Sequence, residues 1–274
     1  MRTKSMSTAL LALGLVAGVS QVPAAAVETP QPTAQVGVAD VADVPDGYYD
    51  DAEGKTGEEL RSSLHTIIST DVTQLSYDEV WDALKMTDED PANPANVILL
   101  YSGESRSEDQ NGGDSDDWNR EHVWAKSHGD FGTATGPGTD VHHLRPTDVT
   151  VNSTRGNLDF DEGGEEVEDA PGNFVDGDSW EPRDEVKGDV ARMIMYMDVR
   201  YDGEDGFADL EVNDEVDNGS NPNIGKISML LQWNEQDPPD EFEQNRNDVI
   251  YDEIQHNRNP FIDHPEWADA IWAG

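Results

Sequence analysis

Two stretches of the sequence decide the fold, WNREHVWAKSHG at residues 118–129 and TDVHHLRPTDVTVNSTRGNLDF at residues 139–160. Residues 119–125 and residues 141–145 have the composition of two strands. Thr147 or Asp148 then provides the N-cap of a helix, because a short polar side chain there accepts hydrogen bonds from the first free backbone N–H groups. The two stretches therefore predict the order strand, loop, strand, helix.

The predicted helix presents polar side chains on one face. Asp148, Asn152 and Arg155 are spaced i, i+4 and i+7, so an amide and a guanidinium lie together. An asparagine inside a helix has a low propensity, and a solvated position alone would explain it. Its place beside a group of histidines points to chemistry instead.

Four histidines fall close together in these stretches, namely His122, His128, His142 and His143. Zinc is a common partner of clustered histidines, but the H-E-x-x-H spacing is absent and the chain has no cysteine to supply thiolates. A zinc hydrolase built on His142 and His143 stays open as an alternative.

Oxygen ligands beside a histidine favour a magnesium site. Mg²⁺ takes few ligands from protein and the rest from water and phosphate, and Glu121 and Asn152 can supply two. His122 is then free as a neutral base. A base, a metal and nearby arginines are what phosphodiester hydrolysis requires, with Mn²⁺ or Ca²⁺ as substitutes for Mg²⁺.

Adjacent residues of a regular strand point to opposite faces, so Glu121 and His122 cannot both face one substrate on a sheet surface. The sequence therefore predicts a bulge or a strand end at this point.

The rest of the chain predicts mostly helices. The fold class is α+β, a mainly helical single domain over residues 47–274 whose small sheet holds the strand–strand–helix unit. The predicted elements are helices after the capping boxes of Thr56 with Glu59 and Ser76 with Glu79, a buried strand at 97–101, surface loops at 104–117 and 161–178, and helices at 184–201, 227–233 and 241–255.

The first residues have the pattern of a secretory signal peptide. Arg2 and Lys4 precede an apolar run at residues 9–19 and small residues at 24–26. We expect a signal peptide at 1–26, a flexible leader at 27–46, and a secreted protein with no membrane span.

Acidic residues dominate the composition, since 59 Asp and Glu against 17 Lys and Arg give a formal net charge of −42. With 35% hydrophobic residues the chain can still build a core, which argues against wholesale disorder. Such acidity suggests adaptation to concentrated salt, where the Debye length falls to about 3 Å and carboxylate repulsion is screened. An acidic surface that captures cations is the other interpretation.

Five motifs carry a resemblance to a known family: REHVW at 120–124, D-x-H-x-L-x-P at 140–146, N-x-x-R-x-N at 152–157, VKGDVAR at 186–192 and RNPFIDHPEW at 258–267. In these motifs the chain resembles the endonuclease I family of secreted and periplasmic nucleases. The resemblance implies a ββα-metal, or His-Me, finger.

The resemblance also implies roles for single residues. His122 matches the family's general base, and Glu121 and Asn152 match its metal ligands. Arg155 and Asn157 match polar positions of the same helix, which we expect to act in catalysis and substrate binding respectively.

Other matched positions surround this group. Arg120 and Arg145 are expected phosphate contacts, by charge and location only. His142 matches a second, mainly structural histidine, with Asp140 beside it, and His143 receives no role.

The leading hypothesis is a secreted, sequence-nonspecific endonuclease acting on DNA and/or RNA, which leaves 5′-phosphate products and works as a monomer. The alternative is an acidic extracellular cation-binding or surface interaction protein, motivated by the Asp-rich stretch 198–217. Its carboxylates lack the order of a calcium loop.

Overall fold

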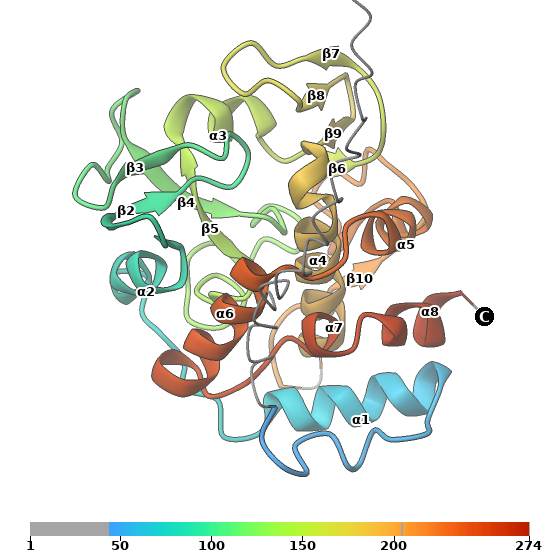
Figure 1. Ribbon diagram of the computed structural model, residues 1–274. Coiled ribbons are helices and arrows are strands. Elements are labelled where there is room, and N and C mark those ends of the chain that lie inside the picture. Colours follow the sequence, from blue (N-terminus) through green and yellow to red (C-terminus); the bar gives the residue numbers. More distant parts are fainter. Residues whose placement is uncertain (1–43, 204, 274) are drawn as a thin grey trace, which may run out of the picture. The chain divides into compact units, whose positions relative to one another are not determined.

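The computed structural model describes residues 44–273 except residue 204 (Figure 1). The predicted signal peptide, 1–26, and the predicted leader, apart from residues 44–46, lie outside the described residues. In the part of the chain that is described, no helix is long and apolar enough to cross a membrane.

The protein combines helices with short strands, which confirms the α+β class. The helices are α1 (Gly57–Ser69), α2 (Glu79–Thr87), α3 (Val149–Arg155), α4 (Lys187–Arg200), α5 (Ile227–Gln236), α6 (Glu241–Val249), α7 (Pro260–Asp263) and α8 (Glu266–Trp272), with a 3₁₀ turn at Asp184–Val186 and a π-helical turn at Ile250–Ile254.

Within residues 44–273 the strands form four small sheets. These are β1 (Glu89–Asp90), β2 (Asn93–Ile98) and β3 (Ser105–Ser107); β4 (Trp118–His122) with β5 (Leu144–Asp148); β6 (Asp159–Phe160), β9 (Ser179–Glu181), β8 (Phe174–Val175) and β7 (Glu165–Glu166) in that spatial order; and β10 (Glu211–Val212) with β11 (Asn223–Ile224).

The predicted strand–strand–helix order is confirmed by β4, β5 and α3. β4 and β5 are antiparallel, with Glu121 opposite Arg145. Asp148 is the N-cap of α3, and its side chain accepts hydrogen bonds from the backbone N–H groups of Thr150 and Val151.

The second strand begins later than predicted, at residue 144 instead of 141. The backbone N–H of His142 donates to Oδ1 of Asp140, over 3.0 Å, and residues 141–143 form a turn. A side chain that bonds its own backbone two residues on competes with strand pairing, which explains the shift.

The predicted irregularity near Glu121 takes the form of a strand end. The pairing of β4 with β5 is regular through His122, where β4 stops. No bulge is needed, because the pocket described below lies along an edge of the strand.

Helix α4 lies in the middle of the helical part of the fold (Figure 1). It packs against α1, α5 and α7, and every residue from Lys187 to Arg200 is buried. The predicted helix at 184–201 is confirmed by α4, and its Met193 and Met197 belong to the core, since both are almost fully buried.

Several local predictions need correction. The helix after Thr56 forms, but the Thr56 side chain makes no capping bond, whereas Ser76 and Glu79 do bond reciprocally. The strand predicted at 97–101 ends at Ile98. The predicted loops at 104–117 and 161–178 contain the short strands β3, β7 and β8.

Candidate active site

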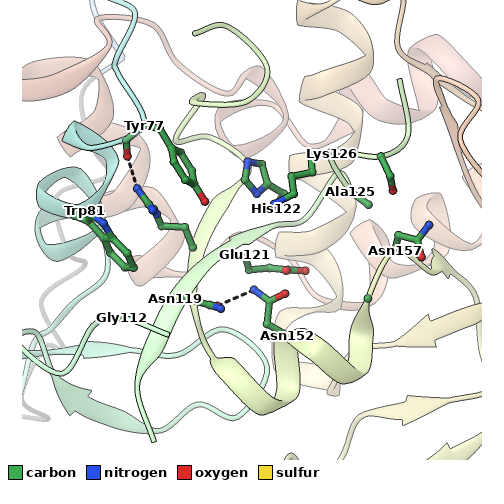
Figure 2. Close-up of a pocket in the computed structure, with 13 residues that line it drawn as sticks. Tyr77, Trp81, Gly112, Asn119, Glu121, His122, Ala125, Lys126, Asn152 and Asn157 are labelled. Carbon is green, nitrogen blue, oxygen red and sulfur yellow. Dashed lines mark hydrogen bonds between the residues drawn. The ribbon is translucent and has the colours of Figure 1, made fainter. Parts of the chain in front are cut away.

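A pocket of about 400 Å³ lies beside β4 (Figure 2). Four consecutive residues of β4, 119–122, line the pocket, and no residue of β5 does. The pocket therefore follows the edge of β4 that β5 leaves uncovered. Side chains from both faces of a strand can reach its edge, which is how Glu121 and His122 come to line one pocket.

The ring of His122 has a defined orientation. Its Nε2 lies 3.1 Å from the carbonyl oxygen of Gly138. A carbonyl oxygen only accepts hydrogen bonds, so Nε2 carries the proton and Nδ1 holds the lone pair. Burial, followed by the neighbouring His143, lowers the pKa of His122 well below its usual value. The ring is therefore neutral near pH 7, with Nδ1 as its basic atom.

The carboxylate of Glu121 is held from one side. Tyr101 donates its hydroxyl proton to Oε1 over 3.0 Å, and Nη1 of Arg155 lies 3.5 Å from the same oxygen. Glu121 is only 2% exposed, and burial raises its pKa above the usual value, although the Arg155 charge opposes this rise.

Asn152 presents its oxygen to the same pocket. Its Nδ2 donates a hydrogen bond of 2.8 Å to Oδ1 of Asn119, drawn as a dashed line in Figure 2. Because the amide nitrogen is engaged there, Oδ1 of Asn152 is the end left for another partner.

These side chains suit a hard divalent cation. Glu121 and Asn152 come from β4 and α3 and offer a carboxylate and an amide oxygen in one pocket. Mg²⁺ usually takes only one or two protein oxygens and completes its shell with water and substrate phosphate. The two residues therefore fit the group that the sequence predicted.

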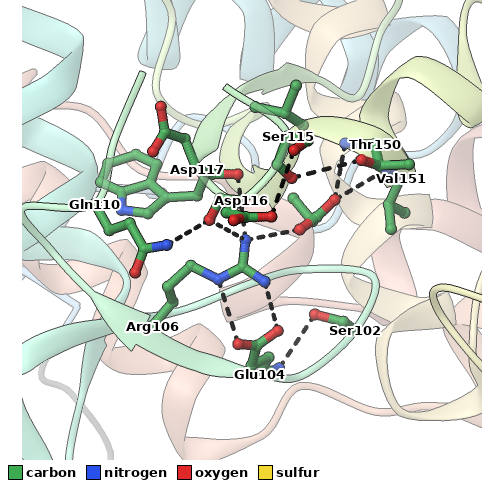
Figure 3. A network of polar contacts seen from close by, with 12 residues as sticks. Ser102, Glu104, Arg106, Gln110, Ser115, Asp116, Asp117, Thr150 and Val151 are labelled. Carbon is green, nitrogen blue, oxygen red and sulfur yellow. Dashed lines mark hydrogen bonds and ion pairs between the residues drawn. The ribbon is translucent and has the colours of Figure 1, made fainter. Parts of the chain in front are cut away.

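Arg106 ties the start of α3 to the loop before β4, and Figure 3 shows it beside Glu104, Asp116 and Asp117. Nη1 of Arg106 donates to Oδ2 of Asp148 over 2.7 Å, while Nη2 bonds Glu104. The same Nη1 also contacts the carbonyl oxygens of Asp116 and Asp117. Arg106 is thus committed to protein groups and holds the N-terminus of α3, three residues ahead of Asn152.

Arg155 is close to the site but does not line it. The residue is fully buried, and its guanidinium donates to the carbonyl oxygens of His122 and Val123. This placement corrects the expectation of a catalytic group, because the side chain cannot touch a substrate in the pocket. Arg155 instead positions Glu121 and the end of β4.

Arg145 lies elsewhere. Its Nε bonds Asp88 over 2.5 Å and its Nη1 bonds Asp189 over 3.2 Å, and the residue is 1% exposed. The expected phosphate contact is corrected by this burial, since both ion pairs would have to break before a phosphate could bind.

Arg120 and Asn157 both line the pocket. The Arg120 guanidinium lies between two aromatic rings, 3.4 Å from the centroid of Tyr77 and 3.9 Å from that of Trp81. Cation–π contacts on both faces fix the plane of the guanidinium.

Asp140, His142 and His143 have partners inside the protein. Asp140 accepts hydrogen bonds from the hydroxyls of Tyr196 and Tyr201. Nε2 of His142 lies 3.2 Å from Oδ1 of Asn257. Nε2 of His143 lies 2.7 Å from the Pro137 carbonyl oxygen, and its Nδ1 accepts from the Trp124 backbone.

These contacts engage both ring nitrogens of His143 and Nε2 of His142, whereas Nδ1 of His142 is buried without a hydrogen-bond partner among the described residues. Among the described residues no group of three or more His, Cys, Asp or Glu side chains could hold a metal. The geometry therefore gives the zinc hydrolase no support.

Several residues that line the pocket had no predicted role, among them Tyr77, Trp81, Asn119 and Lys126. Asn119 is two residues before Glu121 and therefore shares its face of the strand. This spacing could have identified Asn119 from the sequence. Tyr77 and Trp81 lie about forty residues upstream in and before α2, and no motif connects them with β4.

Comparisons with known proteins agree with these observations. Residues 56–266 match the family model described as Endonuclease I. An extracellular ribonuclease of Bacillus subtilis (strain 168) is 70% identical over 227 residues, which cover 83% of this chain and 78% of the relative. An extracellular ribonuclease of Bacillus amyloliquefaciens is 69% identical over 225 residues, 82% of this chain and 78% of the relative. The chain belongs to the endonuclease I family.

Proposed function

We propose that the protein is a secreted endonuclease that hydrolyses phosphodiester bonds without sequence preference. His122 is its general base, and Glu121 and Asn152 hold one divalent metal, Mg²⁺ or in its place Mn²⁺ or Ca²⁺. The extracellular ribonucleases to which the chain is similar support both secretion and RNA as a substrate. DNA is proposed as well, because water and not the ribose 2′-OH is the nucleophile.

One observation carries the proposal. The Gly138 carbonyl fixes the proton of His122 on Nε2, so the basic Nδ1 belongs to a neutral ring in a pocket shared with Glu121 and Asn152. A neutral base and two oxygen ligands in one pocket are the parts that metal-assisted hydrolysis needs.

Different residues of the chain have different roles in the proposed hydrolysis. Nδ1 of His122 accepts a proton from the attacking water as the new P–O bond forms and the bond from phosphorus to the 3′ oxygen breaks. Arg155 and Tyr101 keep Glu121 in place, and Asn119 does the same for Asn152. A bound divalent metal would neutralise charge on the phosphate and stabilise the departing oxygen. Asn157 and Arg120 contact the substrate.

The product ends follow from this polarity. Attack by water with departure of the 3′ oxygen leaves a 5′-phosphate and a 3′-hydroxyl. DNA ligase seals such nicks directly. Nicked plasmid that resists ligation until its ends are exchanged by phosphatase and kinase would reverse the polarity.

The test is cleavage of plasmid DNA and of RNA by the purified protein after chelation and metal add-back. We expect EDTA to stop cleavage and Mg²⁺ to restore it. Restoration by zinc alone would favour the hydrolase based on His142 and His143. No cleavage of either substrate would favour the acidic cation-binding or surface interaction protein.

A further inference from the structure

The positive side chains of this acidic protein are almost all neutralised by the protein itself. In the described part of the chain every lysine and arginine forms an ion pair with a carboxylate except Lys55, Arg120 and Lys126. Lys55 bonds Ser63 near the start of α1. The other two both line the pocket beside β4.

This pairing decides where a nucleic acid can bind. A phosphate that approaches a paired arginine must compete with the carboxylate already bound, in a protein whose net charge of −42 repels it. At an unpaired cation the phosphate meets no such competitor. The pocket is therefore the place where two cations remain available to an anion.

Arg120 is built for such contact. Its two faces are covered by Tyr77 and Trp81, which leaves its N–H donors in the plane of the guanidinium. One donor, on Nη1, bonds the Tyr77 carbonyl oxygen, and Nε is buried without a partner among the described residues, so a phosphate would meet the outer end of the guanidinium. An arginine held in this way loses little side-chain freedom when it binds a phosphate oxygen.

Lys126 stands four residues beyond His122 and is exposed. It lines the same pocket as Glu121 and His122, and its charge opposes the rise in the pKa of Glu121 that burial causes and adds to the fall in the pKa of His122. Figure 2 shows Tyr77 and Trp81 on one side of His122, with Lys126 and Asn157 on the other.

We propose that Arg120 and Lys126 form a phosphate-binding pair that holds the backbone of a nucleic acid on the two sides of the scissile phosphate. The inference rests on the proposed nuclease function for its choice of ligand. It adds that the strand runs along the free edge of β4, and that its charged contacts are confined to this pair while the rest of the surface repels it.

The experiment measures binding, so that it does not depend on cleavage. A fluorescein-labelled single-stranded DNA oligonucleotide is titrated with protein in EDTA at NaCl concentrations from 0.1 to 0.5 M. Each phosphate contact contributes about 0.7 to the slope of log Kd against log salt for a single strand. We expect Lys126→Gln and Arg120→Gln each to make the slope shallower by about 0.7 and to weaken binding several-fold at 0.1 M.

Lys55→Gln is the matched control, because it removes an unpaired cation away from the pocket. Its slope should equal that of the unaltered chain. The exposed Lys126 keeps the test decisive even if Arg120→Gln does not fold. Slopes for Lys126→Gln that match the Lys55→Gln control, or no binding by the unaltered chain, would overturn the pair. Binding with the expected slopes but no cleavage in Mg²⁺ would instead overturn the nuclease function.

Discussion

Asn152 donates a hydrogen bond from Nδ2 to Oδ1 of Asn119, over 2.8 Å, and this bond decides which end of its amide faces the pocket. The contact joins α3 to β4 across the site. Without it the amide could rotate and present N–H groups, which cannot bind a cation.

Replacing Asn119 by alanine should therefore weaken the metal site without removing a ligand. Loss of an orienting partner typically costs about 10–100-fold in metal affinity. We expect the Mg²⁺ concentration for half-maximal cleavage to rise by that factor for Asn119→Ala, and by at least as much for Asn152→Ala. An unchanged Mg²⁺ titration in Asn152→Ala would remove that residue from the metal site.

His122→Ala should abolish most cleavage, because removal of a general base typically costs about 10²–10⁴-fold in rate. The change removes a ring from the pocket and no core contact of β4 with β5. We expect oligonucleotide binding in EDTA to match that of the unaltered chain, which separates a base from a binding residue. Full cleavage activity in this variant would refute the mechanism.

The sequence predicted the parts of this site that are local. Asp148, Asn152 and the strand that carries Glu121 and His122 are fixed by spacing and by capping chemistry within a few residues. The β4–β5–α3 unit could therefore be predicted before any contact was known.

The roles of the arginines could not be predicted in the same way. Arg145 pairs with Asp88 and Asp189, which are 57 and 44 residues away, and the acceptors of Arg155 are backbone carbonyls 32 and 33 residues away. Charge and sequence proximity favoured a phosphate contact for Arg145, and the family resemblance favoured a catalytic role for Arg155. Only the tertiary packing shows that the two guanidinium groups are already bound to carboxylates and carbonyl oxygens of the protein.

Arg145→Met should accordingly lower stability and leave the site intact. The change removes the nearer ion-pair partner of Asp88, which is fully buried, and leaves it only the more distant Arg246. Breaking one partner from a buried pair costs about 3–5 kcal/mol. Urea unfolding measures this loss, and binding of the oligonucleotide by the folded fraction should not change. A variant of normal stability that binds poorly would restore Arg145 as a phosphate contact.

His143 should make the fold sensitive to mild acid. Burial is the main cause that lowers the pKa of His143 to about 4, although Asp140 acts in the opposite direction. An unfolded histidine titrates near 6.5. Because the folded-state pKa is lowered, the stabilising contribution is complete above pH 6.5 and is lost as pH falls toward 4.

Between pH 7.5 and pH 5.5 this loss amounts to about 1.3 kcal/mol for one histidine. The free energy of unfolding of the unaltered chain, minus that of His143→Gln, should fall by this amount over the same range. Titrating groups that do not interact with His143 are common to both proteins and cancel in the difference, whereas His122 and Asp140, whose pKa values His143 affects, contribute to it. His256→Asn, at an exposed position, controls for the loss of a histidine, and a difference that does not vary with pH would contradict the assignment.

High salt should stabilise and activate this enzyme, against the usual trend for nucleases. Most of the cations in the described residues are held in ion pairs, and 59 acidic against 17 basic residues leave a large excess of carboxylates. Their mutual repulsion opposes the folded state, and screening shortens its range from about 10 Å at 0.1 M to about 3 Å at 1 M.

Counterion release acts in the opposite direction on substrate binding. A basic nuclease with many phosphate contacts loses orders of magnitude in affinity over a fourfold rise in salt. With only Arg120 and Lys126 in contact, the slope is about −1.4, so a tenfold rise in salt costs about 25-fold in affinity. The same rise screens the repulsion between the acidic surface and the substrate, and at saturating substrate the remaining loss of affinity does not limit the rate.

We therefore expect the thermal midpoint and the saturated cleavage rate to reach their maxima near or above 1 M NaCl. Both are measured from 0.1 to 3 M NaCl at fixed Mg²⁺, and KCl at matched ionic strength distinguishes screening from specific sodium binding. A monotonic fall of both quantities would show that the acidity is not an adaptation to salt. That result would favour the alternative in which the acidic surface captures cations. A bound divalent cation neutralises carboxylates at far lower concentrations than screening requires.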